Sequence, residues 1–247
     1  MSTDPAQIRS SRAYQKYKGW NQQVKKGDFS SAEQEVQDFL QMYFKPLSAV
    51  SGYRGLVVDV GANDGVTDSH SLPFIEQGWS ALLIEPHPDM YALIHSLYKD
   101  VASVQMRQAA VHNAPSTEIS LYSGRSNHFG HSTLVPPADR GDWDHQKYLD
   151  DSKTFSVTAS PLTEILEDCG IKRKIDILHV DAEGMGLEVL RSLDYEVYDP
   201  TIISVDIMGP HHEGTADDPL ATSLAEWMAK TGYECVVTHA QSIWKKR

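Results

Sequence analysis

A β-branched run that ends in a glycine turn sets the strongest limit on the fold of this chain. Residues 56–60 read Leu-Val-Val-Asp-Val, and Gly61 follows at once. Consecutive apolar positions of this kind are typical of a strand that is buried on both faces. From Asp59 onward the spacing is Asp-x-Gly-x-Asn-x-Gly, which differs from the Gly-x-Gly-x-x-Gly of a dinucleotide site. A carboxylate two residues before the glycine would repel a pyrophosphate, so the turn suits a cationic ligand.

Similar runs alternate with helical patterns along the rest of the chain. The clearest further strands are predicted at 81–85, 175–181 and 201–207. Weaker strand candidates are 101–107, 119–122, 155–158, 234–238 and 242–244, and helices are predicted at 89–98, 162–168, 187–193 and 220–230. Apolar strands that alternate with helices indicate an α/β fold, here a doubly wound and mostly parallel sheet.

The sequence divides into a helical lead-in and one main domain. Residues 1–50 are polar, with apolar positions at helical spacing from Phe39 to Phe44. We expect them to form an N-terminal helical extension that packs on the main domain or covers its site. The main domain is predicted at 51–247. Within it, 124–154 form a polar insertion of a length that is usually functional or flexible.

The charge balance argues against nucleic acid and membrane surfaces as partners. Lys and Arg total 22 and Asp and Glu total 34, which gives a formal net charge of −12 in 247 residues. An acidic surface repels phosphate backbones, which nucleic-acid-binding proteins must neutralise. No apolar run approaches the roughly 18–20 residues that span a bilayer. We therefore expect neither a nucleic-acid nor a membrane partner.

The termini and the cysteines point to the cytoplasm. The first residues show neither a basic stretch nor an apolar stretch of a secretory signal. Cys169 and Cys235 are too few and too far apart for a disulfide framework or a cysteine-based zinc site. A reducing, cytoplasmic environment fits both observations.

Four acidic residues come at the carboxyl ends of predicted strands. Asp59 and Glu85 lie at the ends of the first two clear strands, and Asp181 and Asp206 lie at the ends of the later pair. Ligands of open parallel sheets bind beyond these ends, and an acid at Glu85 is placed to accept both hydroxyls of a ribose. Four carboxylates on one rim would repel each other unless a cationic ligand or a metal relieved them.

The order of these motifs resembles the FkbM-like family of class I S-adenosylmethionine-dependent methyltransferases. The resemblance covers roughly residues 55–205. It rests on 57–65, 83–88, 109–111 and on 175–184 running into 187–190. It implies a seven-stranded, Rossmann-like methyltransferase sheet that is mostly parallel, with one antiparallel strand near the C-terminus.

The same resemblance implies S-adenosylmethionine as the cofactor and assigns its site. The loop from Asp59 to Gly65 would hold the methionine part, Glu85 the ribose, and the segment 108–110 would border the adenine. Gln108 stands where many class I enzymes carry an acid. The implied cofactor residues are Asp59, Gly61, Ala62, Asn63, Asp64, Gly65, Glu85, Pro86, Ala110 and Asp181.

The predicted chemistry is methyl transfer to an oxygen, either a hydroxyl or a carboxyl, of a small molecule such as a sugar or a specialised metabolite. The enzyme must align the acceptor with the methyl group and remove its proton. Candidate catalytic residues are His211, Asp181 and Glu183, and histidine suits general-base work near neutrality. In the polar insertion, His128 and His131 either reach the acceptor or decorate a surface loop.

A divalent metal is a further hypothesis. Asp181, Asp206 and His211 offer the oxygen and nitrogen ligands that Mg²⁺ or Mn²⁺ accepts. Such an ion could bind an acceptor hydroxyl and lower its pKa. The resemblance to the family does not require it.

Other functions stay open at this point. A nucleotide-dependent oxidoreductase on a related fold lacks its Gly-x-Gly-x-x-Gly motif here, and a nucleic-acid methyltransferase conflicts with the net charge of −12. A non-catalytic module that kept the cofactor pocket is opposed by the intact Asp59, Glu85 and Asp181. The sequence also leaves open whether the chain forms a homo-oligomer.

Overall fold

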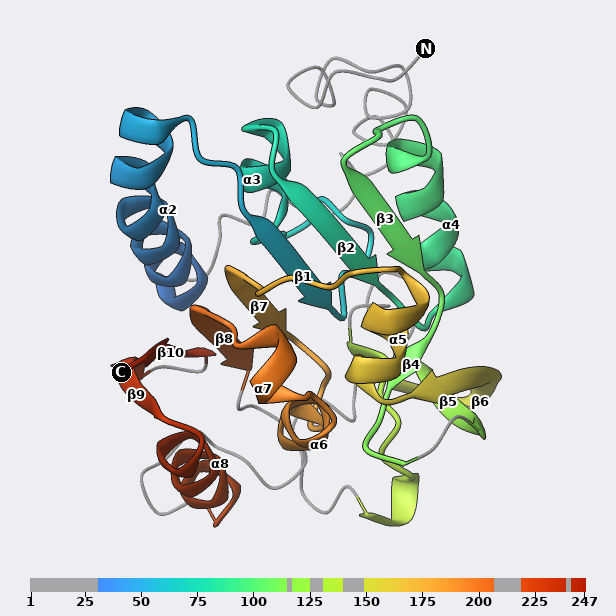
Figure 1. Ribbon diagram of the computed structural model, residues 1–247. Coiled ribbons are helices and arrows are strands. Elements are labelled where there is room, and N and C mark those ends of the chain that lie inside the picture. Colours follow the sequence, from blue (N-terminus) through green and yellow to red (C-terminus); the bar gives the residue numbers. More distant parts are fainter. Residues whose placement is uncertain (1–30, 115–116, 125–130, 140–148, 207–218, 239–240) are drawn as a thin grey trace.

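The large sheet of the protein has the predicted doubly wound, mostly parallel form. The computed structural model describes residues 31–114, 117–124, 131–139, 149–206, 219–238 and 241–247 (Figure 1). Its seven-stranded sheet has the order β3-β2-β1-β7-β8-β10-β9. The strands are β1 Leu56–Val60, β2 Ser80–Ile84, β3 Val104–Arg107, β7 Ile177–Val180, β8 Ile202–Asp206, β9 Tyr233–Thr238 and β10 Gln241–Lys246. β10 alone runs opposite to the other strands of this sheet, because it pairs antiparallel with both β8 and β9, which confirms the predicted antiparallel strand near the C-terminus.

Helices cover both faces of this sheet because its central strands are apolar on both faces. One face is covered by α2 Ser31–Ser51, α3 Leu72–Glu76 and α4 Pro88–Tyr98. The other is covered by α5 Leu162–Asp168, α6 Gly186–Arg191, α7 Tyr195–Tyr198 and α8 Pro219–Lys230. In β1, Val57 packs in the cluster that includes α2, whereas its neighbour Val58 packs with α5 and α6. The short helices α3 and α7 were absent from the sequence prediction.

The described part of the N-terminal extension packs on the sheet. Leu40 and Phe44 of α2 are buried, and the rings of Phe44 and Trp79 meet edge to face with centroids 5.1 Å apart. Both helix residues belong to the same apolar cluster as Val57 of β1. From residue 31 onward, the lead-in is therefore part of the core on the α2 face.

A second, three-stranded sheet adds to the predicted architecture. It has the order β4-β6-β5, with β4 Ala110–Val111, β5 Thr117–Gly124 and β6 Leu149–Ser160. The predicted strands 119–122 and 155–158 pair with each other in this sheet, with Leu121 opposite Phe155. A short 3₁₀ helix, η3 Pro137–Asp139, follows β5. The predicted polar insertion therefore contains part of a strand, because β6 begins at Leu149.

The strand order creates a crevice at the centre of the large sheet. The strand β1 lies between β2 and β7, and the chain moves away from β1 in opposite directions on its two sides. Ligands of open α/β sheets bind at such a switch point, beyond the carboxyl ends of the strands. Figure 1 shows the small sheet beyond the arrowheads of β1, β2 and β3. Among the described helices, none is long and apolar enough to cross a membrane.

Candidate functional site

The turn after β1 is packed directly against the end of β7. The backbone N–H groups of Gly61 and Ala62 both donate to the carbonyl oxygen of Ile84, at 3.0 and 3.1 Å. Gly61 has a φ of +85°, and a Cβ there would lie 1.8 Å from the carbonyl oxygen of Asp181. Only glycine fits this position, because both the conformation and the contact exclude a side chain. The exposed backbone of the turn therefore forms part of the crevice.

The remainder of this loop is held by its own contacts. The Asp64 carboxylate accepts the backbone N–H groups of Val66 and Thr67, at 2.8 and 2.7 Å. A Cβ on Gly65, which has a φ of +75°, would come 2.8 Å from the ring of Tyr98. Asp64 and Gly65 thus shape the loop from within.

Glu85 is a buried carboxyl group just beyond the end of β2. Its side chain accepts the backbone N–H of His87 at 2.7 Å and that of Asn63 at 2.9 Å. Burial raises the pKa of Glu85 to about 8, and the two N–H donors offset only part of that effect. Further hydrogen-bond donors from a ligand would therefore stabilise its ionised form.

Asp59 is also buried, but it lies behind the crevice. Its side chain is 2% exposed, and burial raises its pKa to about 6, while a hydrogen bond with Ser71 acts in the opposite direction. Asp59 is not among the side chains that line the pocket described next.

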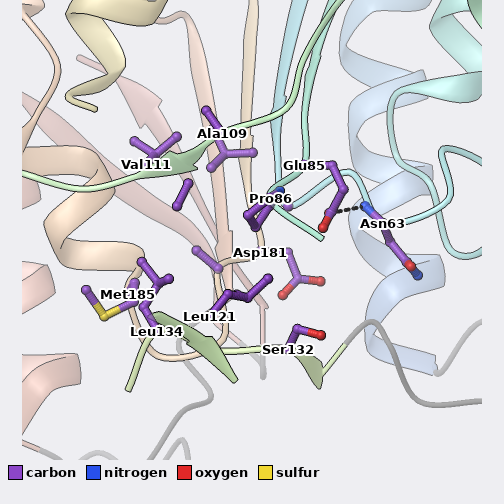
Figure 2. A pocket seen from close by; sticks show the side chains of 14 residues that line it. Asn63, Glu85, Pro86, Ala109, Val111, Leu121, Ser132, Leu134, Asp181 and Met185 are labelled. Atoms are coloured by element: carbon purple, nitrogen blue, oxygen red, sulfur yellow. Dashed lines mark hydrogen bonds between the residues drawn. The ribbon is translucent and has the colours of Figure 1, made fainter. Parts of the chain in front are cut away.

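A pocket of about 530 Å³ lies at the carboxyl ends of β1, β2 and β7 and has two unlike halves. Its polar lining side chains are Asn63, Glu85, Ser132 and Asp181. Its apolar lining side chains include Ala109, Val111, Leu121, Leu134 and Met185. Figure 2 shows the oxygen and nitrogen atoms on the right and Val111, Leu134 and Met185 on the left. A concave site with an apolar lining and a few polar groups suits a small molecule.

The segment that follows β5 is attached to the loop after β7. The Thr133 hydroxyl donates to the carbonyl oxygen of Glu183 at 2.9 Å, and Nδ1 of His131 lies 3.1 Å from Oε1 of Glu183. Thr133 also pairs with Tyr122 of β5 through two backbone hydrogen bonds of 2.9 and 3.0 Å. Glu183 itself has a φ of +43°, which is uncommon for a residue with a side chain. These contacts hold residues 131–135 on the pocket wall.

The structure brings some of the predicted cofactor residues to the pocket and places others behind it. The pocket wall includes Gly61, Asn63, Glu85, Pro86, Ala110 and Asp181. The buried residues Asp59, Ala62, Asp64 and Gly65 do not line the pocket. Gln108 is exposed and does not line the pocket, whereas Ala109 and Ala110 do. The predicted catalytic residue Glu183 is adjacent in sequence to Ala182, which lines the pocket.

The predicted metal ligands are only partly within the described chain. Asp181 lines the pocket and Asp206 ends β8, but His211 and the insertion residue His128 lie outside the described residues. In the described part of the chain, no group of three His, Cys, Asp or Glu side chains could hold a metal ion. A metal that uses His211 stays a prediction.

A separate polar group lies buried on the α2 face of the sheet. The rings of His70 and His179 meet with centroids 4.7 Å apart, and Nδ1 of His70 lies 3.1 Å from Oε1 of Gln37 in α2. Burial lowers the pKa of His179 to about 4 and that of His70 well below its usual value. Both rings are therefore neutral at pH 7. Neither ring lines the pocket.

Several lining residues carried no signal in the sequence. Leu121, Ser132, Leu134 and Met185 belong to β5, to the segment after it and to the loop before α6. None of them forms a motif with its neighbours, since apolar and small polar residues occur at many non-functional positions. Only their three-dimensional positions on the pocket wall identify them.

The fold and the pocket define the class of protein. A doubly wound sheet with one antiparallel strand near its C-terminus, and a pocket at its switch point with a carboxylate after β2, is the arrangement of the class I methyltransferases. The profile of the methyltransferase FkbM domain matches residues 59–235, well over half of the chain. The chain belongs to the FkbM methyltransferase family. Membership of this family implies S-adenosylmethionine as the methyl donor.

Solved structures give distant similarities. The methyltransferase FkbM from Methylobacillus flagellatus KT is 12% identical, with a TM-score of 0.48 over 78% of this chain. Monomeric WbdD is 11% identical, with a TM-score of 0.48 over 92% of this chain. The chain covers 43% of the length of each of these two proteins. A methyltransferase from Geobacter sulfurreducens is 9% identical, with a TM-score of 0.44 over 96% of this chain and 90% of its own. No curated protein sequence matches the chain.

Proposed function

We propose that this protein transfers the methyl group of S-adenosylmethionine to an oxygen of a small molecule, a hydroxyl or a carboxyl group, as in a sugar or a specialised metabolite. The observation that supports the cofactor part most strongly is Glu85. It is a buried carboxyl group at the switch point that accepts two backbone N–H groups and faces the pocket. Two vicinal ribose hydroxyls would donate to this carboxylate and so compensate for its burial.

The two halves of the pocket fit the two ends of the cofactor. The adenine ring suits the apolar half, where Val111, Leu134 and Met185 offer carbon surface. The charged methionine part suits the polar half, beside the Gly61 turn and Asn63. With the ribose on Glu85, this orientation directs the sulfur towards the polar half of the pocket. A positive sulfonium is also attracted by the acidic side chains there.

The chain's own residues supply positioning and proton removal. When bound, S-adenosylmethionine supplies an activated methyl group on a positively charged sulfur. Glu85 fixes the ribose, and the rigid Gly61 turn fixes the direction in which the rest of the cofactor extends. Asp181 lines the same polar half and is a candidate to bind the acceptor or its proton. Such alignment is a large part of catalysis in methyl transfer.

The net charge and the cysteines support proposals for the class of acceptor and for the cellular compartment. A net charge of −12 favours a neutral or cationic small molecule over a nucleic acid as the acceptor. Cys169 and Cys235 do not form a disulfide, which fits a reducing cytoplasm. Light scattering, which measures the molar mass in solution, tests whether the chain forms a homo-oligomer.

The test starts from binding and continues to transfer. Calorimetry of the purified protein with S-adenosylhomocysteine is expected to show micromolar binding, with no comparable binding of NAD⁺. A titration repeated with chelator, and then with Mg²⁺ or Mn²⁺, examines the metal hypothesis. A screen of hydroxylated and carboxylated small molecules with methyl-labelled cofactor then tests transfer. Tight NAD⁺ binding without S-adenosylhomocysteine binding would contradict the proposal, and cofactor binding without transfer across the panel would favour a non-catalytic module.

A further inference from the structure

We propose that His87 is a positioning residue for the cofactor, because its buried side chain joins Glu85 to the segment after β5 that carries Ser132. This role rests on the proposed function and adds to it the residue that holds two walls of the pocket in place relative to each other. His87 does not line the pocket, whereas Glu85 and Ser132 do. A continuous chain of hydrogen bonds connects these two lining residues through His87.

The backbone of His87 orients the Glu85 carboxylate. Pro86 and Pro88 have no backbone N–H, so His87 is the only one of these three residues with such a donor. It donates to Oε1 of Glu85 at 2.7 Å, whereas Oε2 accepts the N–H of Asn63 at 2.9 Å. A residue that precedes a proline favours an extended backbone, and His87 has a ψ of 123°. The direction of the carboxylate therefore depends on where the backbone of His87 is held.

Hydrogen bonds at both ring nitrogens hold the side chain of His87. The backbone N–H of Asp89 donates to Nδ1 at 3.2 Å, which makes His87 the N-cap of α4. Burial lowers the pKa of His87, with Asp89 acting against this shift and Lys153 adding to it, so the ring is neutral at pH 7. Because Nδ1 is an acceptor, the one hydrogen of the neutral ring is on Nε2. Nε2 donates it to Oγ of Ser123 in β5, at 3.1 Å.

From Ser123 the chain of hydrogen bonds continues to the pocket wall. The Ser123 hydroxyl donates to the carbonyl oxygen of Gly124 at 2.8 Å, and the Gly124 N–H donates to Oγ of Ser132 at 3.0 Å. Ser132 lines the pocket, and Figure 2 shows it on the same side as Glu85. The ring of His87 therefore connects the carboxylate after β2 with a hydroxyl group on the part of the wall that follows β5.

The link between His87 and Ser123 is buried and packed. Both residues are fully buried, and the ring of Phe155 in β6 meets that of His87 edge to face, with centroids 4.9 Å apart. A hydrogen bond between buried side chains is costly to break, because water does not replace the lost partner. The loop after β2 is therefore held against the small sheet.

The position of His87 affects the ribose site through the charge state of Glu85. Burial raises the pKa of Glu85 to about 8, the neighbouring carboxylates of Asp59 and Asp64 raise it as well, and the N–H groups of His87 and Asn63 lower it. If the backbone of His87 moved away, the pKa would rise further. Glu85 would then be protonated over a wider range of pH, and ribose hydroxyls would bind more weakly there.

Capping of α4 is the competing role for His87. An acceptor at Nδ1 stabilises the start of the helix whether or not Nε2 has a partner. Asparagine separates the two roles, since its side-chain oxygen is among the preferred N-cap acceptors, whereas its amide does not extend to the place of Nε2. If capping were the whole role, His87→Asn would bind the cofactor like wild type.

Calorimetry with S-adenosylhomocysteine at pH 8 tests the link with two variants that break it from opposite ends. His87→Asn removes the donor, and Ser123→Ala removes its acceptor. Each should bind about fivefold more weakly than wild type, and the double variant should bind no more weakly than the single ones, since all three lack the same link. The matched controls, His95→Asn in α4 and Ser156→Ala in β6, change exposed residues and should bind like wild type. A cooperative thermal transition shows that each variant is folded.

The pH profile of binding gives a readout that a loss of stability alone would not move. In wild type the affinity should rise as Glu85 ionises, and in His87→Asn and Ser123→Ala the rise should shift to higher pH by about half a unit. Wild-type affinity in both variants, an unshifted profile, or losses that add up in the double variant would overturn the role of His87 while leaving the proposed function intact. Failure of the wild-type protein to bind S-adenosylhomocysteine at all would overturn both.

Discussion

The polar and apolar halves of the pocket are built by different parts of the molecule. The polar half comes mainly from the turns that follow β1, β2 and β7, whose backbones are joined to one another: the Asp181 N–H donates to the carbonyl oxygen of Val60 at 2.9 Å. The apolar half comes largely from the small sheet and the segment after it, through side chains such as Leu121 and Leu134. The large sheet therefore fixes directions and charges, whereas the small sheet supplies shape and carbon surface.

The two halves also differ in their effect on the stability of the folded protein. Burial raises the pKa of Glu85 to about 8, so the native protein holds a proton there that the unfolded chain has lost above its ordinary value of 4.5. The free energy of unfolding therefore falls as the pH rises from about 4.5 to about 8. Asp59 acts in the same direction over a narrower range, since its pKa is raised to about 6. The apolar lining side chains carry no titratable group, so the small sheet adds its half of the pocket without this cost.

The largest effect is expected at the junction of the two turns in the polar half. In Gly61→Ala the new Cβ would collide with the carbonyl oxygen of Asp181, so the turn must move away from β7. We expect affinity for S-adenosylhomocysteine to fall about a hundredfold, measured by calorimetry. Gly232→Ala is the matched control, because Gly232 also has a positive φ, +90°, but nothing lies within 4 Å of its Cβ position. It should cost about 1 kcal/mol of stability and leave binding unchanged. Equal loss of binding in both variants would show that the contact with β7 is not what matters.

The second-largest effect is expected in the pH dependence of binding, which should come from the polar half of the pocket alone. The ribose hydroxyls donate to the ionised form of Glu85, so binding lowers its pKa from about 8 in the free protein. Affinity for S-adenosylhomocysteine should therefore rise about tenfold between pH 6.5 and 8.5. In Glu85→Gln the rise should disappear. A wild-type profile that is flat or falls with pH would mean that the carboxylate does not face the ribose.

Truncation in the apolar half should have a smaller and pH-independent effect. Leu134→Ala removes carbon surface from a half-buried lining side chain, worth about 1 kcal/mol, so affinity should fall about fivefold. The ratio of this variant to wild type should stay constant from pH 6.5 to 8.5. A loss as large as that of Gly61→Ala would mean that the small sheet contributes more than shape.

The smallest effect is expected at the boundary of the apolar half. Gln108 is exposed and does not line the pocket, although it precedes Ala109 and Ala110, which do. Gln108→Ala should therefore change affinity for S-adenosylhomocysteine less than about twofold, well under 0.5 kcal/mol. A clear loss would place the adenine edge nearer to Gln108 than the structure indicates.

The contrast between the halves explains what the sequence could predict. The strands of the large sheet are buried on both faces, so β1 and β2 were found within about one residue of their observed bounds. Glu85 was found because the carboxyl ends of parallel strands meet at one rim, where an acid after β2 is placed next to the Asp59 motif and can accept ribose hydroxyls. These inferences need only local patterns and the rules of parallel sheets.

The apolar half of the pocket could not be predicted from local patterns in the sequence. The two-residue strand β4 is too short to give a pattern, and residues 119–122 looked like part of the main sheet until their pairing with β6 was known. Leu121 and Leu134 are ordinary apolar residues whose role depends on where the small sheet lies. The pairing of His131 with Glu183 joins residues 52 positions apart, and no spacing rule connects them.

The central claim is that the buried carboxylate of Glu85 recognises the ribose of S-adenosylmethionine in the polar half of the pocket. The most direct test is calorimetry with S-adenosylhomocysteine at pH 8.5, comparing wild type, Glu85→Gln and the exposed control Glu164→Gln of α5. Loss of a charged acceptor for buried hydroxyls costs roughly 1.5–3 kcal/mol, so Glu85→Gln should bind at least about tenfold more weakly. Glu164→Gln should bind like wild type. Equal affinity of Glu85→Gln and wild type would contradict the claim.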